Sequence, residues 1–282
     1  MTQPRIPAQS SPHRRRDPAV SIGVAGYPVA TKALPTSEHT SGMYALRFAQ
    51  SPEELEAILK LRFEVFNLEL DEGFAESYHT GRDEDELDAR FHHLAITHKP
   101  TGAIVGTYRM QTAQMAAAMG GFYSAGEFDL GGIPADILED AVEIGRACVA
   151  KAHRNGRVLQ LLWRGLAQYL TWNHKRYLFG CCSLTSQDLD LGYRVYQFLL
   201  AEGHADADSC VTPLDGLECA PDPTRDSPRP EVHIPALFQS YLNLGARVCG
   251  PPAIDRRFQT IDYLVLLDIQ ALDERIYRVF FG

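Results

Sequence analysis

The sequence predicts one large α/β domain behind a disordered N-terminal tail. Strand-like and helix-like segments alternate from residue 44 onward, no internal repeat is visible, and 45% of the 282 residues are apolar, enough to fill a sizeable core. Residues 1–43 are rich in Pro, Ser, Thr and Gly and lack apolar periodicity, which is typical of disorder. We therefore assign 1–43 to the tail and 44–282 to the domain.

The clearest unit of the domain is 141–170, in which a β run, a basic glycine-containing turn and an amphipathic helix follow one another. The β run carries Glu143 and Arg146 where most strands bury only Val and Ile. Residues three apart point to opposite faces of a regular strand, so these side chains share a site only if a bulge near Gly145 re-aims Arg146. Free N–H groups at the start of the following helix form a generic anion cradle.

Composition excludes several classes of protein. The net charge of −9 does not suggest a nucleic-acid partner, and no apolar run approaches the roughly 20 residues of a membrane span. The basic cluster near the N-terminus has no apolar stretch behind it, so it does not resemble a secretory signal. The six cysteines include no C-x-x-C pair. We expect a reduced, cytoplasmic protein without a metal site.

The first half of the domain shows a strand, a helix, an acidic loop and a hairpin. A strand is expected at 44–48, and a helix begins after Ser51, the expected N-cap, with Pro52 in its first turn and Glu54 completing a capping box. Arg62 lies on the apolar face of this helix, as either an ion-paired or a functional arginine. Residues 71–90 form an acidic loop, for which a solvated loop is the simplest interpretation. A hairpin follows, with strands at 93–98 and 103–110.

The second half continues the alternation. A small-residue helix is expected at 114–119, a buried strand at 177–183, helices at 188–202 and 236–244, and a last strand at 263–268. Residues 204–234 are proline-rich with little periodicity, which indicates a long excursion rather than a domain boundary. The apolar and basic segment 275–281 is either a docking tail or a weak contact with a membrane surface.

The element order resembles the GNAT acyltransferase fold, which implies a central, mixed, mostly antiparallel sheet flanked by helices. Four motifs occur in the order found in acyl-homoserine-lactone synthases: Arg62-x-x-Val65-Phe66, Asp83-x-Asp85-x-x-Asp88, Gly106-Thr107-Tyr108-Arg109 and Glu143-x-x-Arg146. The amino-acid sequence of residues 143–149 and 250–256 is instead similar to that of the bacterial ornithine N-acyltransferases. The resemblance covers about residues 44–270.

This resemblance implies transfer of a (3-hydroxy)fatty acyl group from acyl carrier protein to the α-amine of an amino acid such as ornithine, which gives lyso-ornithine lipid. It implies no cofactor beyond the phosphopantetheine that the carrier co-substrate brings. The expected partners are acyl carrier protein and the amino acid, with a peripheral contact at the inner membrane surface as a further expectation.

Roles for individual residues follow from the resemblance and from the chemistry of amide formation. Glu143 is the expected general base, since an α-amine is mostly protonated at pH 7, and Arg146 and Arg109 complete the catalytic group. Arg62, Phe66, Asp85 and Asp88 are expected to hold the amino acid. The expected carrier-binding residues are Gly145, Arg154, Gly156 and Arg157. Two simpler interpretations stay open: a structural Glu143–Arg146 ion pair, and a solvated turn for Arg154 and Arg157.

Several rival functions are weighed on the same residues. A serine hydrolase would need G-x-S-x-G, and a glycerolipid acyltransferase would need His and Asp five apart; neither pattern is present. An acyl-homoserine-lactone synthase is the nearest enzymatic rival, followed by an N-acyl amino acid synthase for glycine or another amino acid. A GNAT-like scaffold that only binds carrier protein ranks last, because Glu143, Asp88 and Arg109 are all present.

Overall fold

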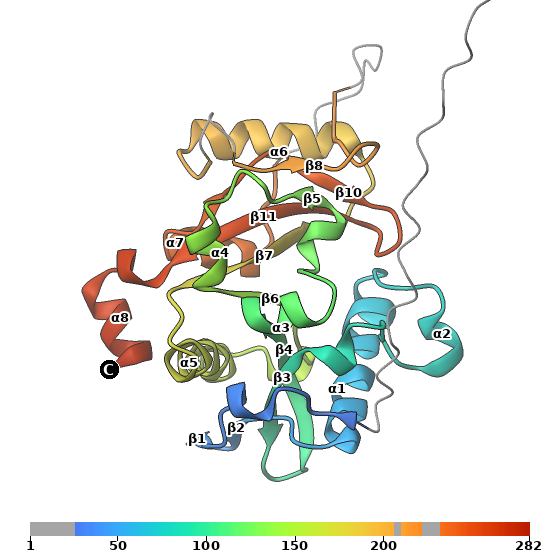
Figure 1. Cartoon of the computed structure of the whole chain (residues 1–282). Helices are drawn as coiled ribbons and strands as arrows, with labels where there is room; N and C mark the ends of the chain where they lie inside the picture. Colours follow the sequence, from blue (N-terminus) through green and yellow to red (C-terminus); the bar gives the residue numbers. More distant parts are fainter. Residues whose placement is uncertain (1–25, 206–209, 222–231) are drawn as a thin grey trace, which may run out of the picture.

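The computed structural model describes residues 26–205, 210–221 and 232–282, and one twisted sheet runs through these residues (Figure 1). The strand order is β1-β2-β3-β4-β6-β7-β11-β10, with β9 also paired to β11, while β5 and β8 form a separate pair. Among the described strands, β6 and β7 run parallel and the other pairs run antiparallel. The expected mixed, mostly antiparallel sheet is confirmed.

The strands are β1 (His39–Ser41), β2 (Tyr44–Phe48), β3 (His92–His98), β4 (Ala103–Thr112), β5 (Phe128–Asp129), β6 (Ala141–Val149), β7 (Tyr177–Leu184), β8 (Thr212–Pro213), β9 (Arg247–Val248), β10 (Ala253–Asp255) and β11 (Thr260–Asp268). The α-helices are α1 (Pro52–Phe63), α2 (Ser77–Thr80), α3 (Ala113–Ala118), α4 (Ala135–Glu139), α5 (Gly156–Trp172), α6 (Leu189–Ala201), α7 (Ala236–Asn243) and α8 (Glu274–Phe281).

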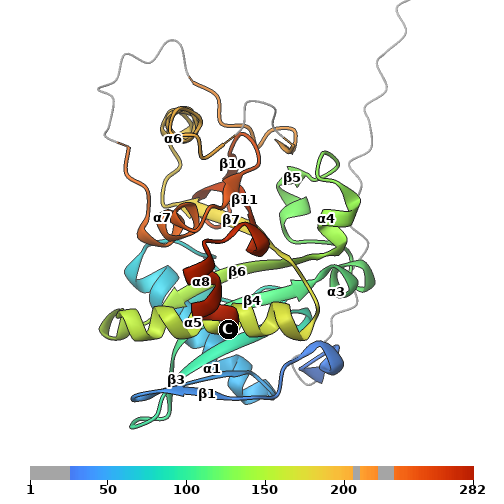
Figure 2. The ribbon, with the colours of Figure 1, turned by 90° about the vertical axis from the view of Figure 1, so that its left-hand side faces the viewer.

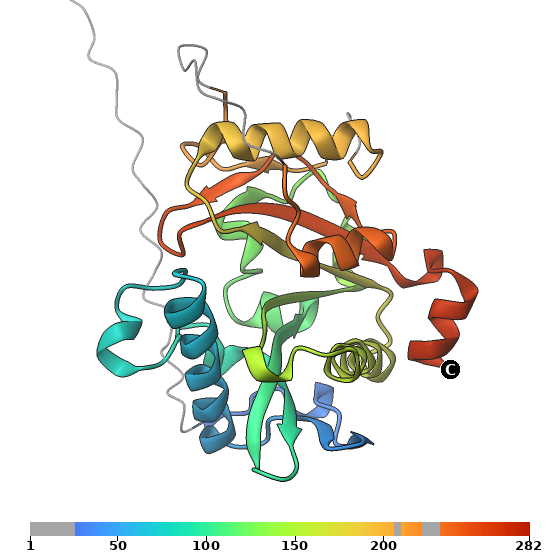
Figure 3. The same cartoon turned by 180° about the vertical axis from the view of Figure 1, so that it is seen from behind.

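Helices cover both faces of the sheet. Figures 1 and 3 show α1 and α5 on opposite sides of the β3–β4 hairpin, and α6 and α7 lie over the part formed by β7, β10 and β11. The apolar stripe of α5 packs into the main core against β2, β3 and β4. The smaller cluster on the opposite face joins Leu55, Ile58 and Leu59 of α1 to Ala95 of β3.

Local sequence signals account for where the two long helices begin. Ser51 caps α1 by accepting a hydrogen bond from the Glu54 amide at 3.4 Å, and Pro52 occupies the first turn, where its missing N–H costs nothing. Asn155 caps α5 by accepting from the amides of Arg157 and Val158. After Phe63 the chain continues in a π-helical turn, Glu64–Glu69, which carries Phe66 toward the sheet.

The central strand β6 has the predicted bulge. Thr107 of β4 pairs with Cys148 and Arg109 pairs with Gly145, so Arg146 and Ala147 together oppose Tyr108. Arg146 adopts a left-handed conformation with φ of 47°. This conformation turns its side chain to the sheet face that also carries Glu143.

The expected disordered tail is too long, because residues 26–43 have a defined conformation. Strand β1 pairs with β2, and Tyr27 and Leu34 are buried, Leu34 in the main core. Isolated apolar residues such as these produce no periodicity, and sequence patterns therefore miss them. The tail expectation for residues 1–25 lies outside the described residues.

The C-terminal part is more elaborate than predicted. Strands β9 and β10 are too short to give a sequence signal, and part of the proline-rich excursion returns to the body, where β8 pairs with β5. The closing segment forms α8, which lies beside α5 (Figure 2) with the Phe280 ring 6.0 Å from the Trp163 ring. No helix in the described ranges combines the length and apolarity needed to cross a bilayer.

Candidate active site

A cavity between strands lies where the two parallel strands β6 and β7 separate. β6 and β7 are paired only from Ala141 to Glu143 and from Tyr177 to Phe179, after which the strands diverge. The space between them holds a cavity of about 310 Å³. A Cβ on Gly180 would lie 2.1 Å from the carbonyl oxygen of Ile144, so only glycine lets the strands approach this closely at the start of the split.

The cavity has an apolar end and a polar end, and strand alternation explains why. On β7 and β11, successive side chains point to opposite faces: Leu178 and Val265 join the core beneath α5, whereas Phe179 and Leu264 join the cluster around Phe128. The apolar lining is Leu178, Leu237, Phe238, Tyr241, Val265 and Leu267. The polar lining is Glu72, Arg109, Tyr123, Glu143, Arg146 and Asp262.

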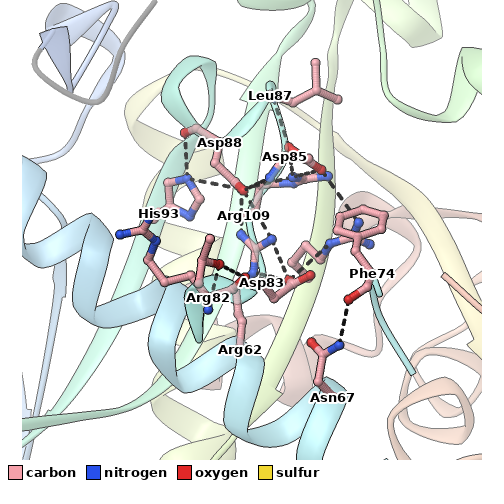
Figure 4. Close-up of polar contacts among 12 residues, drawn as sticks. Arg62, Asn67, Phe74, Arg82, Asp83, Asp85, Leu87, Asp88, His93 and Arg109 are labelled. Carbon is pink, nitrogen blue, oxygen red and sulfur yellow. Dashed lines mark hydrogen bonds and ion pairs between the residues drawn. The ribbon is translucent and has the colours of Figure 1, made fainter. Parts of the chain in front are cut away.

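A buried network of arginines and aspartates borders the polar end (Figure 4). Arg62 of α1 donates from Nε to Asp83 at 2.7 Å and from Nη1 to Asp88 at 2.5 Å. Arg109 of β4 donates to both oxygens of Asp85, at 2.9 and 2.8 Å, and to Asp88 at 3.0 Å. The last third of the acidic loop is therefore a buried element rather than a solvated one.

Electrostatics within this Arg–Asp network are self-compensating. Burial alone would raise the pKa of Asp88, but Arg62 and Arg109 hold that pKa well below its usual range. Burial also lowers the pKa of the neighbouring His93 to about 4, so this ring is neutral at pH 7. Asp85 and Asp88 are predicted to receive the cationic side chain of an amino acid. In this structure both carboxylates are already paired with arginines, so neither is free to do so.

Arg146 lies between this network and the cavity. Its guanidinium is 3.6 Å from the carboxylates of Asp83 and Asp85, and it stacks 3.9 Å above the Phe258 ring centroid. The alternative of a Glu143–Arg146 ion pair is therefore wrong for this structure. Phe66, predicted to contact substrate, lines the cavity and packs edge-on against Phe258 at 5.4 Å.

Glu143 is buried and fully hydrogen-bonded. Its Oε1 accepts from the Ser124 amide at 2.7 Å and the Ser124 hydroxyl at 2.6 Å, and its Oε2 accepts from Gln111 at 2.6 Å and the Tyr123 amide at 2.8 Å. A carboxylate with four donors has no lone pair left for the proton of an amine unless one donor withdraws. The geometry gives Glu143 an anchoring function for the 123–124 loop, and its role as a general base stays a prediction.

A second acidic group borders the polar end without arginine partners. Asp262 stands opposite Ser183 across the β7–β11 pair, and Glu127 approaches it from the turn before β5. Burial raises the pKa of both carboxyls. Repulsion by the nearby Asp255 carboxylate raises each of them further. Nearby, Glu72 accepts a hydrogen bond from Thr185, and burial raises its pKa as well.

Three of the four predicted carrier-binding residues lie at the start of α5, and the two arginines among them already contact other parts of the protein. Arg154 makes a bidentate pair with Glu69 at 2.6 and 2.8 Å. Gly156 is the first helical residue, and a Cβ there would meet nothing within 4 Å. The Arg157 guanidinium lies against Gly42 in the β1–β2 turn. Gly145 faces open space in the cavity wall, where a side chain would project into the cleft.

Sequence reasoning missed Asp262, Glu127 and Thr185. Asp262 carried a usable signal, because it is a charged residue inside the apolar strand Thr260–Asp268, the same anomaly that singled out Glu143. Glu127 lies in a turn that looks ordinary, and its burial comes from the β5–β8 contact that covers it.

Comparisons with known proteins support the acyltransferase fold and identify the family. A solved structure described as the AHL synthase LasI superposes with a TM-score of 0.44 at 12% identity, over 87% of this chain and 96% of that one. A family model described as the acetyltransferase (GNAT) domain matches residues 61–164. The chain is 29% identical over 252 residues to the L-ornithine N(alpha)-acyltransferase of Agrobacterium fabrum, across 86% of each chain.

A second relative is more extensively covered. The L-ornithine N(alpha)-acyltransferase of Rhodobacter capsulatus is 30% identical over 249 residues, across 84% of this chain and 94% of that protein. The chain is thus an acyltransferase that belongs to the L-ornithine N(alpha)-acyltransferase family.

Proposed function

We propose that this enzyme transfers a fatty acyl group from the phosphopantetheine thioester of acyl carrier protein to the α-amine of ornithine. The observation that carries the proposal is the cavity at the split between β6 and β7, which is apolar beneath α7 and polar at its other end, where carboxyls and arginines both line it. A hydrophobic acyl chain suits the first end, and a cationic amino acid suits the second.

The reaction needs the two substrates to meet at the bulge. The neutral amine attacks the thioester carbonyl carbon, the C–S bond breaks, and the phosphopantetheine sulfur leaves as a thiol after taking up a proton. Gly145 and Ala147 line the cleft where the carbonyl oxygen would lie, and backbone amides at this bulge would stabilise the oxyanion as fixed donors.

The amine must lose a proton, and Glu72 is the acceptor that we assign to it. Glu72 lines the cavity, and burial raises its pKa above the usual value for a carboxyl, which makes it a better proton acceptor. Glu143 has four donors to displace first. Arg146 and Arg109 border the same end. Although both are near aspartates, each keeps at least one nitrogen atom that has no hydrogen-bond partner among the described residues and would donate to the α-carboxylate of the amino acid.

The carrier is expected at the start of α5. The positive end of the helix dipole favours an anion at the start of α5, and Arg154 and Arg157 lie beside it. Peripheral contact with the inner membrane is a further proposal, supported by Tyr277 and Val279, which α8 leaves exposed beside two arginines. Cosedimentation with anionic vesicles, with and without residues 274–282, tests that contact.

Mass spectrometry of the product tests the central proposal. The purified full chain is incubated with 3-hydroxypalmitoyl carrier protein and ornithine, with palmitoyl-CoA replacing the carrier thioester as the donor control. We expect N-acyl ornithine from the carrier thioester. Product with glycine but none with ornithine, or lactone product with S-adenosylmethionine, would replace this function by one of its rivals.

A further inference from the structure

The acidic group at the polar end is built from elements far apart in the chain. Asp262 comes from β11, Glu127 from the turn before β5, and Cys181 from β7. One ligand atom from each lies within 4.8 Å of the others. Asp262 and Cys181 also line the cavity, so the group faces the space in which substrate would lie.

These carboxyls lack the compensation that the Arg–Asp network has. Asp262 is only 3% exposed, yet its Oδ1 has no hydrogen-bond partner. Within the described ranges neither Asp262 nor Glu127 forms a salt bridge, whereas Asp83, Asp85 and Asp88 all do. A buried carboxylate with an unfilled lone pair is costly, which points to a bound group that completes the site.

Three kinds of group would complete it: a shared proton, a divalent cation or a substrate ammonium. A shared proton would join the carboxyls of Glu127 and Asp262, which lie within 4.8 Å of each other and whose pKa values burial raises. It leaves Oδ1 of Asp262 unsatisfied. A metal would have two carboxylates and one thiol as its protein ligands, a mixed hard and soft set, and it would have to displace the thiol proton of Cys181.

The ammonium fits best because Asp262 lines the cavity and keeps one carboxylate oxygen without a hydrogen-bond partner in the described part of the chain. We propose that Asp262, supported by Glu127, binds the side-chain ammonium of a diamino acid and so selects ornithine over uncharged amino acids. This inference rests on the acyltransferase function proposed above, and it moves cation recognition from Asp85 and Asp88 to the opposite strand of the cleft. An acceptor with a neutral side chain would leave the acidic group as it is in the free protein.

Acceptor choice tests the inference. Wild type, Asp262→Asn and Glu127→Gln are assayed with ornithine and with norvaline, which is ornithine without its terminal amine. For Asp262→Asn we expect kcat/KM for ornithine to fall about ten- to a hundredfold, as is typical when a charged hydrogen-bond partner is lost, mainly through KM. The value for norvaline should change far less. Asp268→Asn, on the same strand but paired with Arg176 at the surface, is the matched control.

Three outcomes would overturn the inference. Equal losses with ornithine and norvaline would make Asp262 a general or structural residue. Unchanged preference for ornithine would place recognition elsewhere. Activity that a chelator abolishes and a divalent cation restores would make the group a metal site. If instead the wild type acylates neither amino acid, the proposed function fails; calorimetric binding of ornithine to wild type but not to Asp262→Asn would then still support the ammonium site.

Discussion

Two buried charged regions border the same end of the cavity, and they are built on opposite principles. In the Arg–Asp network, three arginines face three aspartates, and each aspartate is within 4 Å of at least one guanidinium. In the acidic group of Glu127 and Asp262, no described cation is paired with either carboxyl. Paired charges fix a structure, whereas unpaired ones leave a position for something to bind.

Substitutions in the two regions should therefore differ in their effects on stability and on activity. Removing one member of the Arg–Asp network leaves a buried charge without a partner and lowers the stability of the fold. Removing the charge of Asp262 relieves repulsion in the free protein, and it affects the enzyme only when a cationic substrate is present. The predictions that follow run from the largest expected effect to the smallest.

Arg62→Met should be the most destabilising change. It leaves Asp83 and Asp88 buried without their main partner, and breaking a buried pair typically costs about 3–5 kcal/mol. Urea denaturation of wild type and variant measures the loss. Arg176→Met, which removes a surface pair with Asp268, is the control and should unfold almost like wild type. Equal midpoints for Arg62→Met and wild type would show that the network does not hold the acidic loop in place.

Glu72→Gln should lower kcat by about 10²–10⁴, the usual range for loss of a general base. Ornithine binding should change less, since the amide keeps the hydrogen-bonding shape of the carboxyl. In the wild type, kcat should rise with pH as Glu72 ionises, through a pKa that burial raises above its usual value. Stopped-flow turnover between pH 5 and 9 gives both results. A variant that retains the wild-type profile would exclude Glu72 as the proton acceptor.

The parts of the fold that the sequence predicts correctly are those with a local cause. Ser51 and Pro52 mark a helix start within four residues, and the strand–turn–helix unit 141–170 carries its own periodicity. Even the bulge follows locally, because residues three apart on a strand cannot otherwise share a face. Burial of Arg62 follows from its place on an apolar helix face.

The site was harder to predict because its chemistry depends on contacts between distant segments. Asp85 and Asp88 look like free acids in an acidic loop, and only the packing of that loop against β4 brings them to Arg109. Glu143 looks like a free base in a strand, and its donors come from a loop with no motif. The pairing state of a charge is a tertiary property, and composition alone does not reveal it.

Glu143→Gln tests a third kind of buried carboxylate, one that is held by four hydrogen-bond donors rather than by arginines. The amide nitrogen of Gln is a donor and accepts from neither Gln111 nor the Tyr123 amide, so at least one buried donor loses its partner, at about 1–3 kcal/mol. We expect an earlier thermal midpoint with nearly normal turnover per folded molecule. Thermal melts and turnover on one preparation decide the matter: normal stability with lost turnover would restore Glu143 as the general base.

The smallest effect concerns the surface pair beside α5. The Arg154 guanidinium, which is predicted to contact the carrier, donates two hydrogen bonds to Glu69. Glu69 therefore competes with the carrier for the same donor groups. Glu69→Gln should free Arg154 and lower KM for acyl carrier protein by roughly two- to fivefold, the range of an exposed ion pair. The gain should shrink as salt is added, because exposed charges are screened. Adding Arg154→Gln to this variant should abolish the gain. A gain that persists in the double variant would mean that the Glu69 charge repels the carrier directly and that Arg154 has no contact with it.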